Sequence, residues 1–270
     1  MIKIKNKNEL EAMRIAGKKT ASILKKVAEK VSPGVTTRDL DAYAADLAKD
    51  EGGRCAFYGY HGFSGHICAS VNEEIVHGVP GNRVIRDGDI VSIDFGLVYN
   101  NFIGDTAITV AAGSISSEWQ ALLNVTKASL EAAIEKAVEG NRIGDISNVV
   151  QRVAEESGFS VVRDFVGHGI GREMHEDPQI PNFGPAGKGP ILKAGMTLAI
   201  EPMINMKSHK IIQHNDGWTI TTKDNLPSVH FEHNIAIING QPEILSTFKY
   251  IYDSLNIFSS EEDEFHNHFS

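Results

Sequence analysis

The sequence predicts an α+β protein built from two copies of a helix–helix–strand unit. Four amphipathic helical stretches come in two pairs, and an apolar, strand-like run follows each pair. Residues 86–94 and 193–201 match with an offset of 107, since both read basic residue, any residue, glycine, then an apolar run ending in isoleucine and an acid. With an offset of 106, four earlier positions match four later ones: Gly34, Asp39, Leu40 and Gly52 with Gly140, Asp145, Ile146 and Gly158. The nearly equal offsets predict pseudosymmetric halves, with Asp94 and Glu201 in equivalent positions about a central site.

The helices are predicted from apolar residues that recur at spacings of three and four. The first covers residues 8–30 and stops at 32–34, where the sequence Ser-Pro-Gly cannot continue a helix. The second begins at Thr37 and ends at the glycine pair 52–53. The third and fourth cover residues 118–139 and 145–157.

Strands are predicted from short apolar or β-branched runs that are bounded by turn residues. These runs cover residues 68–71, 74–76, 90–94, 105–110, 161–166, 197–201 and 228–238. The segment at 54–70 is instead a loop rich in glycine and aromatic residues, among them Tyr60 and Phe63. We expect a loop this apolar to line a pocket rather than to face water.

The turn-like segment at 96–101 predicts a hairpin between two of these strands. If the turn is centred on residues 99–100, Asp94 lies directly opposite Asp105. Directly opposed residues have Cβ atoms about 5 Å apart, which is close enough for two carboxylates to share one cation. A slip of one residue would point the two side chains to opposite faces of the sheet, so this register is a specific prediction.

Composition narrows the classes of function. The 270 residues carry a net charge of −9 at pH 7, and basic residues are dispersed except at 3–30, which argues against a specific nucleic-acid groove. The two cysteines, Cys55 and Cys68, form no CxxC motif, so we expect neither a disulfide framework nor a structural zinc module. We also expect no signal peptide and no membrane span, because no apolar run approaches the roughly 20 residues that cross a bilayer. These features suit the cytoplasm.

We expect one catalytic domain over residues 1–245 and a C-terminal tail over residues 246–270. The tail contains a polar, acidic run at 259–264, and such sequence is typical of partial disorder. Before that run, Phe248, Ile251 and Leu255 have the spacing of a short docking helix.

Acid and imidazole side chains at the edges of strand-like runs predict a metal site. They are Asp94, Asp105, His168, Glu201 and Glu232. Singly, each carboxylate fits a solvated strand end, but a buried one is costly unless it is paired or binds a metal. Four that converge would repel one another without cations between them. We therefore expect a hydrolase with two divalent ions, and the oxygen-rich donor set suits Mn²⁺, Fe²⁺ or Co²⁺ better than structural zinc.

Several motifs, in a fixed order, resemble those of the methionine aminopeptidases over residues 1–245. They are VNEEIVHGVP (71–80), IDFG (93–96), GDT (104–106), GHGIG (167–171), HEDP (175–178), IEPM (200–203) and FEH (231–233). The resemblance implies the pita-bread fold, in which pseudosymmetric halves form a curved antiparallel sheet covered by helices. Because no long insertion separates the last two motifs, the chain is similar to the type 1 class in its short prokaryotic form.

The resemblance also implies how the metal site works. Asp94 would bind one ion, His168 and Glu201 would bind the other, and Asp105 and Glu232 would bridge the two. Two ions held in this way polarise a carbonyl and lower the pKa of a bridging water. A hydroxide that bridges the ions would then attack the first peptide carbonyl of the substrate.

Roles for other residues follow from the same resemblance. His175 would hydrogen-bond the substrate carbonyl and the oxyanion, His77 would contact the scissile amide nitrogen, and Glu201 would shuttle a proton to the leaving amine. Five residues would line the pocket for the methionine side chain, although singly they fit an ordinary core: Tyr60, Phe63, Cys68, Met174 and Trp218. The remaining histidines considered, His61, His66, His230 and His233, are assigned to structural or pocket-rim positions.

Two alternatives share the implied fold. Xaa-Pro aminopeptidases and prolidases carry the same ligands but usually an extra N-terminal domain, and few residues precede the first predicted helix here. Non-catalytic pita-bread binding proteins lose ligands, whereas the full set is present in this sequence. The resemblance therefore implies removal of the N-terminal methionine of nascent polypeptides when the second residue is small. We expect a cytoplasmic monomer without membrane partners, and the basic face at 3–30 is compatible with a transient ribosome contact.

Overall fold

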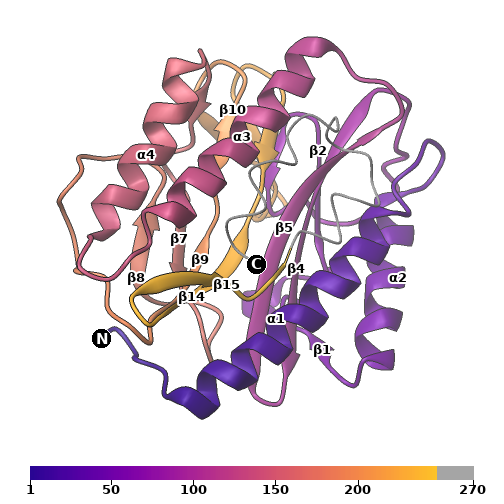
Figure 1. The fold of residues 1–270 in the computed structure, drawn as a ribbon. Helices are drawn as coiled ribbons and strands as arrows, with labels where there is room; N and C mark the ends of the chain where they lie inside the picture. Colours follow the sequence, from indigo (N-terminus) through magenta and orange to yellow (C-terminus); the bar gives the residue numbers. More distant parts are fainter. Residues whose placement is uncertain (248–270) are drawn as a thin grey trace.

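Within residues 1–247, which the computed structural model describes, helices α1, α3 and α4 lie in front of antiparallel strands and α2 lies at their side (Figure 1). The helical elements are α1 (Lys7–Ala28), α2 (Thr37–Asp50), η1 (Tyr60–Gly62), α3 (Ser117–Glu135) and α4 (Ile143–Glu156). The strands of the first half are β1 (Arg54–Cys55), β2 (Cys68–Val71), β3 (Glu74–Val76), β4 (Asp89–Tyr99) and β5 (Phe102–Ala112). Those of the second half are β6 (Ser160–Val161), β7 (Val166–Gly169), β8 (Glu176–Pro181), β9 (Thr197–Ile200), β10 (Met203–Asn205), β11 (Ile211–Gln213), β12 (Ile220–Thr222), β13 (Ser228–His230), β14 (His233–Ile238) and β15 (Gln241–Ile244). The fold is thus α+β, as predicted.

Local caps determine where the helices begin. Before α1, the Asn6 side chain accepts from the backbone N–H of Glu9, whose carboxylate accepts from the Asn6 N–H in return. Thr36 and Asp39 form the same reciprocal pair before α2. The helices are confirmed, and their ends lie within four residues of the predicted ones.

The predicted pseudosymmetry is visible in backbone hydrogen bonds that join the turn before the second helix of each half to the segment before its following strand. In the first half, the Gly34 N–H donates to the carbonyl of Ile85 at 2.9 Å. In the second half, the Gly140 N–H donates to the carbonyl of Leu192 at 3.1 Å. Isolated β-bridges repeat the relation, Thr36 with Val84 and Arg142 with Ile191. In Figure 1, α1 and α2 accordingly cover one half of the molecule, and α3 and α4 cover the other.

The β4–β5 hairpin differs from its predicted register. Its two-residue turn is Asn100-Asn101, with φ angles of 48° and 62°, so the turn lies one residue later than predicted. Asparagine tolerates the positive φ angles that a tight hairpin turn needs at both central positions. Asp94 therefore pairs with Ala107, and Asp105 pairs with Gly96. The prediction that the two aspartates are directly opposed is wrong by two residues, but a shift of two keeps both side chains on one face.

The turn shift also changes where these aspartates lie along their strands. Both lie in the interior of eleven-residue strands rather than at the edge of shorter runs. The segment at 96–99, predicted as turn, continues β4 beyond Asp94, and β5 begins at Phe102, before Asp105. The strand predicted at 228–238 is likewise wrong in its continuity, since Phe231 and Glu232 separate β13 from β14. At this break the backbone of Glu232 bonds to β5 instead, with its N–H 2.9 Å from the Ala107 carbonyl.

Contacts between β5 and the β14 region join the two halves. The Thr106 hydroxyl donates to the carbonyl of Glu232 at 2.7 Å. The backbone N–H of Asp105 donates to the side-chain oxygen of Asn234 at 2.6 Å. All four of these residues are buried. The junction of the two halves is therefore also the place where two of the predicted ligands, Asp105 and Glu232, come together.

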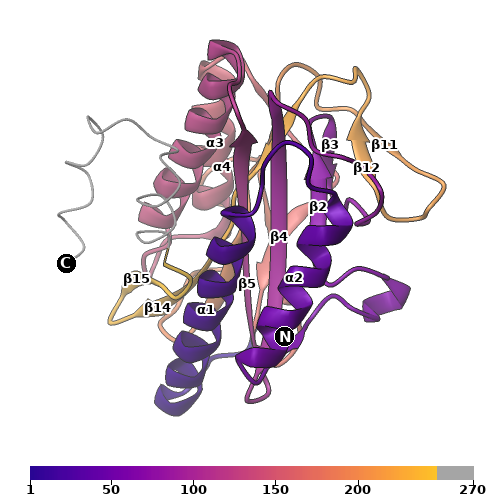
Figure 2. The same cartoon turned by 90° about the vertical axis from the view of Figure 1, so that its right-hand side faces the viewer.

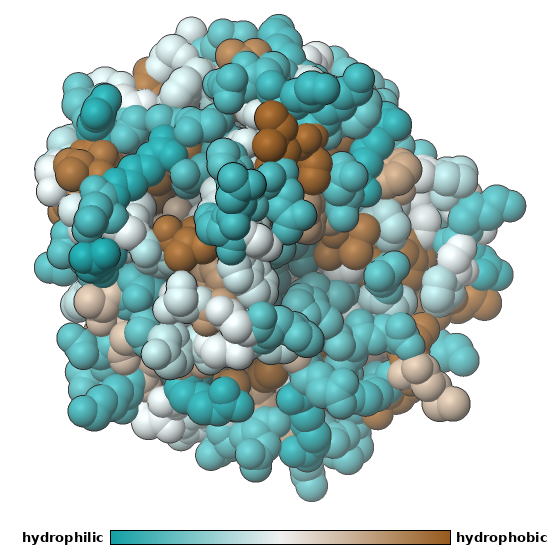
Figure 3. All heavy atoms as spheres, turned by 180° about the vertical axis from the view of Figure 1, so that it is seen from behind, coloured by the Kyte–Doolittle hydropathy of each residue, from teal (hydrophilic) through white to brown (hydrophobic). Residues whose placement is uncertain are grey.

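Within residues 1–247, no helix is both long enough and apolar enough to cross a membrane. Seen from the side opposite the helices, the surface is largely polar, with separate apolar patches (Figure 3). Strands β11 and β12 project on the side away from α3 and α4 (Figure 2).

The tail expected from residue 246, with its docking helix, falls almost wholly outside the described residues.

Candidate metal centre

The predicted ligands come from several strands of both halves and meet at the junction. Asp94 is in β4, Asp105 in β5 and His168 in β7, whereas Glu201 directly follows β9 and Glu232 lies between β13 and β14. One ligand atom each from Asp105, His168 and Glu232 lies within 4.8 Å of the others. His168 Nε2 is also 3.4 Å from Glu201 Oε1 and 3.9 Å from Asp105 Oδ2. The structure thus brings these side chains into one cluster.

Three carboxylates of this cluster each carry an oxygen atom without an ordinary partner in the part of the chain that the structure describes. Asp94 Oδ1, Asp105 Oδ1 and Glu232 Oε1 are buried and have no hydrogen bond among the described residues. Burial raises the pKa of Asp94, Glu201 and Glu232 well above the ordinary carboxyl value, and the neighbouring carboxylates raise it further. Burial also raises the pKa of Asp105, to about 7. Buried, crowded and unpartnered oxygens of this kind are what a divalent cation would neutralise.

The position of His168 depends on the glycines on either side of it. A Cβ on Gly169 would lie 2.1 Å from the Asp177 carbonyl oxygen, and one on Gly167 would lie 2.5 Å from the Ala199 carbonyl oxygen. These close approaches let β7 pack between its neighbours. The Nδ1 atom of His168 is 2.9 Å from the Gly169 carbonyl, so Nε2 faces the carboxylates. Burial lowers the pKa of His168 to about 3, which keeps the ring neutral, the form that binds metal ions.

Two further predicted residues, His77 and His175, lie around the cluster. The ring of His175 stands nearly perpendicular to that of His168, with centroids 4.4 Å apart. The Nδ1 atom of His175 is 2.7 Å from the Tyr60 hydroxyl, so this contact leaves the Nε2 atom of the ring uninvolved. His77 contacts Phe165 and Trp218 edge-on, and burial followed by the effect of His175 lowers its pKa to about 4. Both imidazoles are therefore available as neutral hydrogen-bonding groups.

The backbone at His77 is held in an unusual conformation. Its φ angle is 57°, which is uncommon for a residue other than glycine. The next residue, Gly78, donates its N–H to Ser70 Oγ at 3.1 Å and accepts from the Ala69 N–H at 2.9 Å. A Cβ on Gly78 would lie 2.5 Å from the Ala69 carbonyl oxygen, so only glycine fits this approach.

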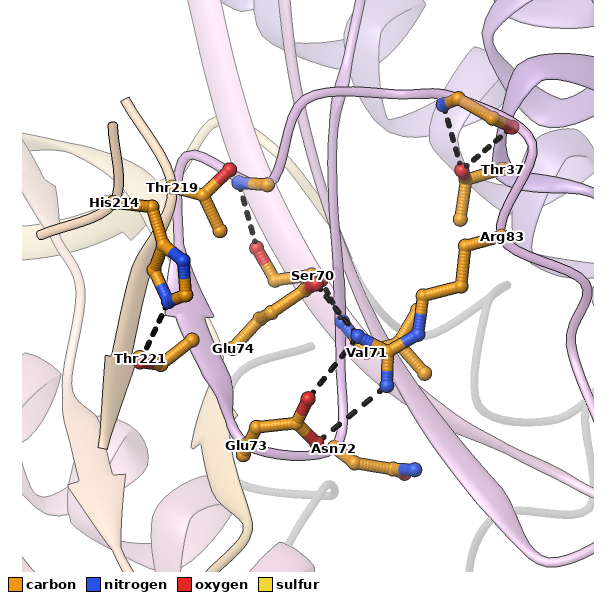
Figure 4. A network of polar contacts seen from close by, with 12 residues as sticks. Thr37, Ser70, Val71, Asn72, Glu73, Glu74, Arg83, His214, Thr219 and Thr221 are labelled. Carbon is orange, nitrogen blue, oxygen red and sulfur yellow. Dashed lines mark hydrogen bonds and ion pairs between the residues drawn. The ribbon is translucent and has the colours of Figure 1, made fainter. Parts of the chain in front are cut away.

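The turn that precedes His77 is fixed by an arginine (Figure 4). Arg83 Nη1 lies 2.6 Å from a Glu74 carboxylate oxygen and 3.2 Å from one of Glu73. Glu74 in turn accepts from the Val71 N–H at 2.7 Å. Side-chain bonds thus close the β2–β3 turn from which the chain leads to His77.

The five predicted pocket residues share one apolar cluster next to the metal ligands. Phe63, Cys68 and Met174 are buried in it, and Tyr60 and Trp218 pack against it. Cys68 is directly opposite Asp94 across the β2–β4 ladder, which places a thiol side chain beside a predicted ligand. Burial raises the pKa of the Cys68 thiol, which disfavours the thiolate form that a nucleophile needs.

His230 is a residue that sequence reasoning placed only at a structural or rim position. It is almost fully buried, and its Nε2 lies 3.8 Å from Glu201 Oε2. Neither ring nitrogen has a hydrogen bond among the described residues. The structure therefore adds His230 to the surroundings of the ligand cluster. The sequence did hold one signal: His230 lies two residues before Glu232, and side chains two apart on a strand point to the same face. That spacing does not show that His230 lies beside Glu201.

Comparisons with known proteins agree with this arrangement. The family model of "Metallopeptidase family M24" matches residues 11–239. A methionine aminopeptidase of Clostridium perfringens is 49% identical over 249 residues, which cover 92% of this chain and 100% of that protein. Methionine aminopeptidase 1 of Bacillus subtilis is 47% identical over 91% of this chain and 99% of that protein. The solved structure of a Thermotoga maritima methionine aminopeptidase has a TM-score of 0.90 at 44% identity, covering 92% of this chain and all of that one.

A more distant likeness concerns the fold alone. The Xaa-Pro dipeptidase of Bacillus anthracis has a TM-score of 0.71 at 19% identity, and this chain covers 62% of it. The architecture is thus common to peptidases with different substrates, and the features that distinguish them lie in the site.

Proposed function

This chain belongs to metallopeptidase family M24, and within it to the type 1 methionine aminopeptidases, and from that premise we propose how it removes an N-terminal methionine. The reaction is a metal-dependent hydrolysis of the first peptide bond. We propose that the substrates are nascent polypeptides and peptides whose second residue is small. The observation that carries this proposal is the group of buried, unpartnered carboxylate oxygens on Asp94, Asp105 and Glu232 beside His168.

We propose that two divalent ions bind here, held by Asp94, Asp105, His168, Glu201 and Glu232. Four carboxylates and one neutral imidazole form a donor set that suits Mn²⁺, Fe²⁺ or Co²⁺. When bound, such ions polarise the carbonyl of the scissile bond and lower the pKa of a water molecule toward neutrality. The mutual repulsion of the carboxylates supports more than one positive ion, because a single divalent charge leaves the cluster negative.

The protein's own residues bind the substrate and move protons. His175 Nδ1 is engaged by the Tyr60 hydroxyl, which leaves Nε2 to donate to the oxygen that becomes negative in the transition state. His77 contacts the amide nitrogen of the bond to be cut. Glu201 accepts a proton from the attacking water and delivers it to that nitrogen, so that the amine leaves uncharged.

The apolar cluster that contains Phe63, Cys68 and Met174 is proposed to take the methionine side chain. A flexible thioether makes favourable contacts with aromatic rings and sulfur atoms. The Phe63 ring meets that of Trp218 edge-on, with centroids 5.1 Å apart, and this gives the pocket a rigid wall. The restriction to a small second residue would come from a tight subsite beyond this pocket.

We propose that the protein acts as a monomer in the cytoplasm, where nascent chains are made. Cys55 and Cys68 are both unpaired and buried, which suits a reducing compartment. A transient contact with the ribosome would involve the basic face of α1.

The test is methionine release by metal-loaded protein from four peptides: Met-Ala-Ser, Met-Pro-Ser, Met-Leu-Ser and Ala-Pro-Ser. We expect release from the first two, little from Met-Leu-Ser, and none after a chelator has been added. Release of alanine from Ala-Pro-Ser would instead indicate a proline-directed peptidase.

Asp94→Asn tests the proposed metal site directly, because the substitution keeps the shape of the side chain and removes its negative charge. We expect it to lose turnover and to bind less metal in a calorimetric titration. Unchanged turnover in this variant would refute the proposed site.

A further inference from the structure

The N-terminal arm, residues 1–6, is joined to the segment that carries His175 by a buried ion pair. Lys5 Nζ lies 2.5 Å from Glu176 Oε2, and the two side chains are 6% and 1% exposed. The other Glu176 oxygen lies 3.2 Å from Lys3 Nζ, which also contacts Glu173 at 3.0 Å. Buried charges of this kind are uncommon unless they are paired, so the carboxylate of Glu176 has a fixed place.

The arm fits a path prepared by two glycines. The N–H of Lys5 donates to the carbonyl of Gly195 at 2.8 Å. A Cβ on Gly195 would lie 2.6 Å from a side-chain carbon of Ile4. A Cβ on Gly171 would lie 2.7 Å from both Lys5 Cε and Glu176 Oε1. Larger residues at 171 and 195 would therefore push the arm away from the segment that it holds.

Glu176 begins strand β8 and directly follows His175. Successive side chains of an extended chain point in opposite directions, and here residues 174–178 alternate between buried and exposed. When Lys5 holds Glu176 on the inner side, the imidazole of His175 is presented on the outer side, toward His168 and Tyr60.

We propose that Lys5 is a positioning residue for His175: its ion pair with Glu176 fixes the segment 170–176 so that the imidazole points into the metal site. This inference rests on the proposed function, in which His175 contacts the reacting oxygen. Lys5 itself touches neither the substrate nor the predicted ligands. It acts through Glu176, and its removal leaves the ligand set complete.

The first test compares Lys5→Met, Lys5→Arg and Glu176→Gln with Lys19→Met. Lys19 is the matched control, since it forms a 2.6 Å ion pair with Glu51 from the same N-terminal region but away from residues 170–176. We expect Lys5→Met to lower kcat for Met-Ala-Ser by about 10²-fold, because a small misplacement of a reacting group has that effect. The metal affinity measured by titration should stay unchanged, Lys5→Arg should recover much of kcat, and Lys19→Met should match the wild type.

A second test separates positioning from general stability. In a His175→Ala background, Lys5→Met should cause little further loss of kcat, because the residue that it positions is absent. An equal loss in both backgrounds would overturn the proposal. So would an unchanged kcat in both Lys5→Met and Glu176→Gln.

Hydrogen–deuterium exchange provides a readout that does not depend on activity. We expect faster exchange of residues 170–176 in Lys5→Met and Glu176→Gln but not in Lys19→Met. If the wild type released no methionine, the proposed function would fail, and the exchange result would still decide the structural part of this inference. Exchange at the wild-type rate in both variants would overturn it whatever the activity.

Discussion

The ligand cluster and the two histidines beside it are held by different kinds of structure. Asp94 and Asp105 lie inside long paired strands, where the ladder of backbone hydrogen bonds fixes each side chain. His77 and His175 instead lie outside the regular strands, one in a positive-φ conformation and the other just before β8. Asp94 and Asp105 are thus placed by the sheet, whereas the two histidines are placed by side-chain contacts from distant parts of the chain.

This difference has a functional consequence. A sheet keeps its ligands in place when one surface contact is lost, so metal binding should tolerate changes outside the cluster. A histidine held by a few polar contacts should lose its orientation when any of them is removed, and turnover should respond before metal binding does. Substitutions in the two regions should therefore separate kcat from metal affinity.

The largest effect is expected at Asp105, where the two halves meet. Asp105→Asn keeps the backbone bond to Asn234 but removes one of the buried charges. We expect turnover to fall below detection and metal affinity to fall with it, as measured by isothermal titration. If the variant still bound two ions with wild-type affinity, the sheet-held cluster would not be the metal site.

His175→Ala should show the opposite pattern. Loss of a hydrogen-bond donor to a developing oxyanion lowers kcat by about 10²–10³-fold. Metal affinity should stay at the wild-type value, because His175 is not among the ligands. A parallel fall in metal affinity would show that the two regions do not act separately.

Tyr60→Phe sharpens the comparison, because it removes one hydroxyl and leaves every ring in place. The 2.7 Å contact to His175 Nδ1 disappears. A hydrogen bond contributes about 0.5–1.5 kcal/mol, so we expect kcat to fall by up to about tenfold. Steady-state kinetics on Met-Ala-Ser would show this, and a large rise in KM with unchanged kcat would assign Tyr60 to the pocket alone.

The smallest effect concerns the stability of metal-free protein. Burial raises the pKa of Asp105 to about 7 and that of three further cluster carboxyls well above their usual range, so the folded state binds more protons than the unfolded state. Stability from these groups therefore falls as pH rises. The buried histidines act oppositely, but only below their unfolded pKa of about 6.5.

We accordingly expect the Tm of the metal-free protein to fall by a few degrees as the pH rises from 6.5 through the Asp105 pKa of about 7. Added Mn²⁺ should remove most of this slope, because the ions replace the protons. Thermal melts with and without chelator would measure it. A Tm independent of pH in chelator would mean that the carboxylates do not crowd one another in the folded protein.

Much of the fold could be predicted because its signals are local. The helices were predicted from apolar residues spaced three and four apart, which needs only one stretch of chain at a time. The offset of 106 to 107 between the two halves reappears in the bonds of Gly34 and Gly140. The hairpin register could not be fixed in this way. The register depends on which two residues form the turn with positive φ angles. The prediction centred the turn on residues 99–100, whereas the structure places it at Asn100 and Asn101.

In the candidate site, too, local features could be predicted from the sequence and contacts between distant residues could not. The ligand positions follow from short motifs, because strand alternation and flanking glycines are encoded beside the ligands themselves. The contact of His230 with Glu201 and that of Lys5 with Glu176 join residues that are far apart in the chain. Neither contact leaves a local pattern, so only the folded structure could show them.

Ala107 has one further consequence. It pairs with Asp94 on one side and bridges to Glu232 on the other, so β4, β5 and the segment between β13 and β14 place aspartate, alanine and glutamate in one row. The buried methyl group of Ala107 thus occupies the middle position of that row, between two predicted ligands. A larger side chain at position 107, such as valine, would therefore crowd the site from within the sheet without replacing any predicted ligand.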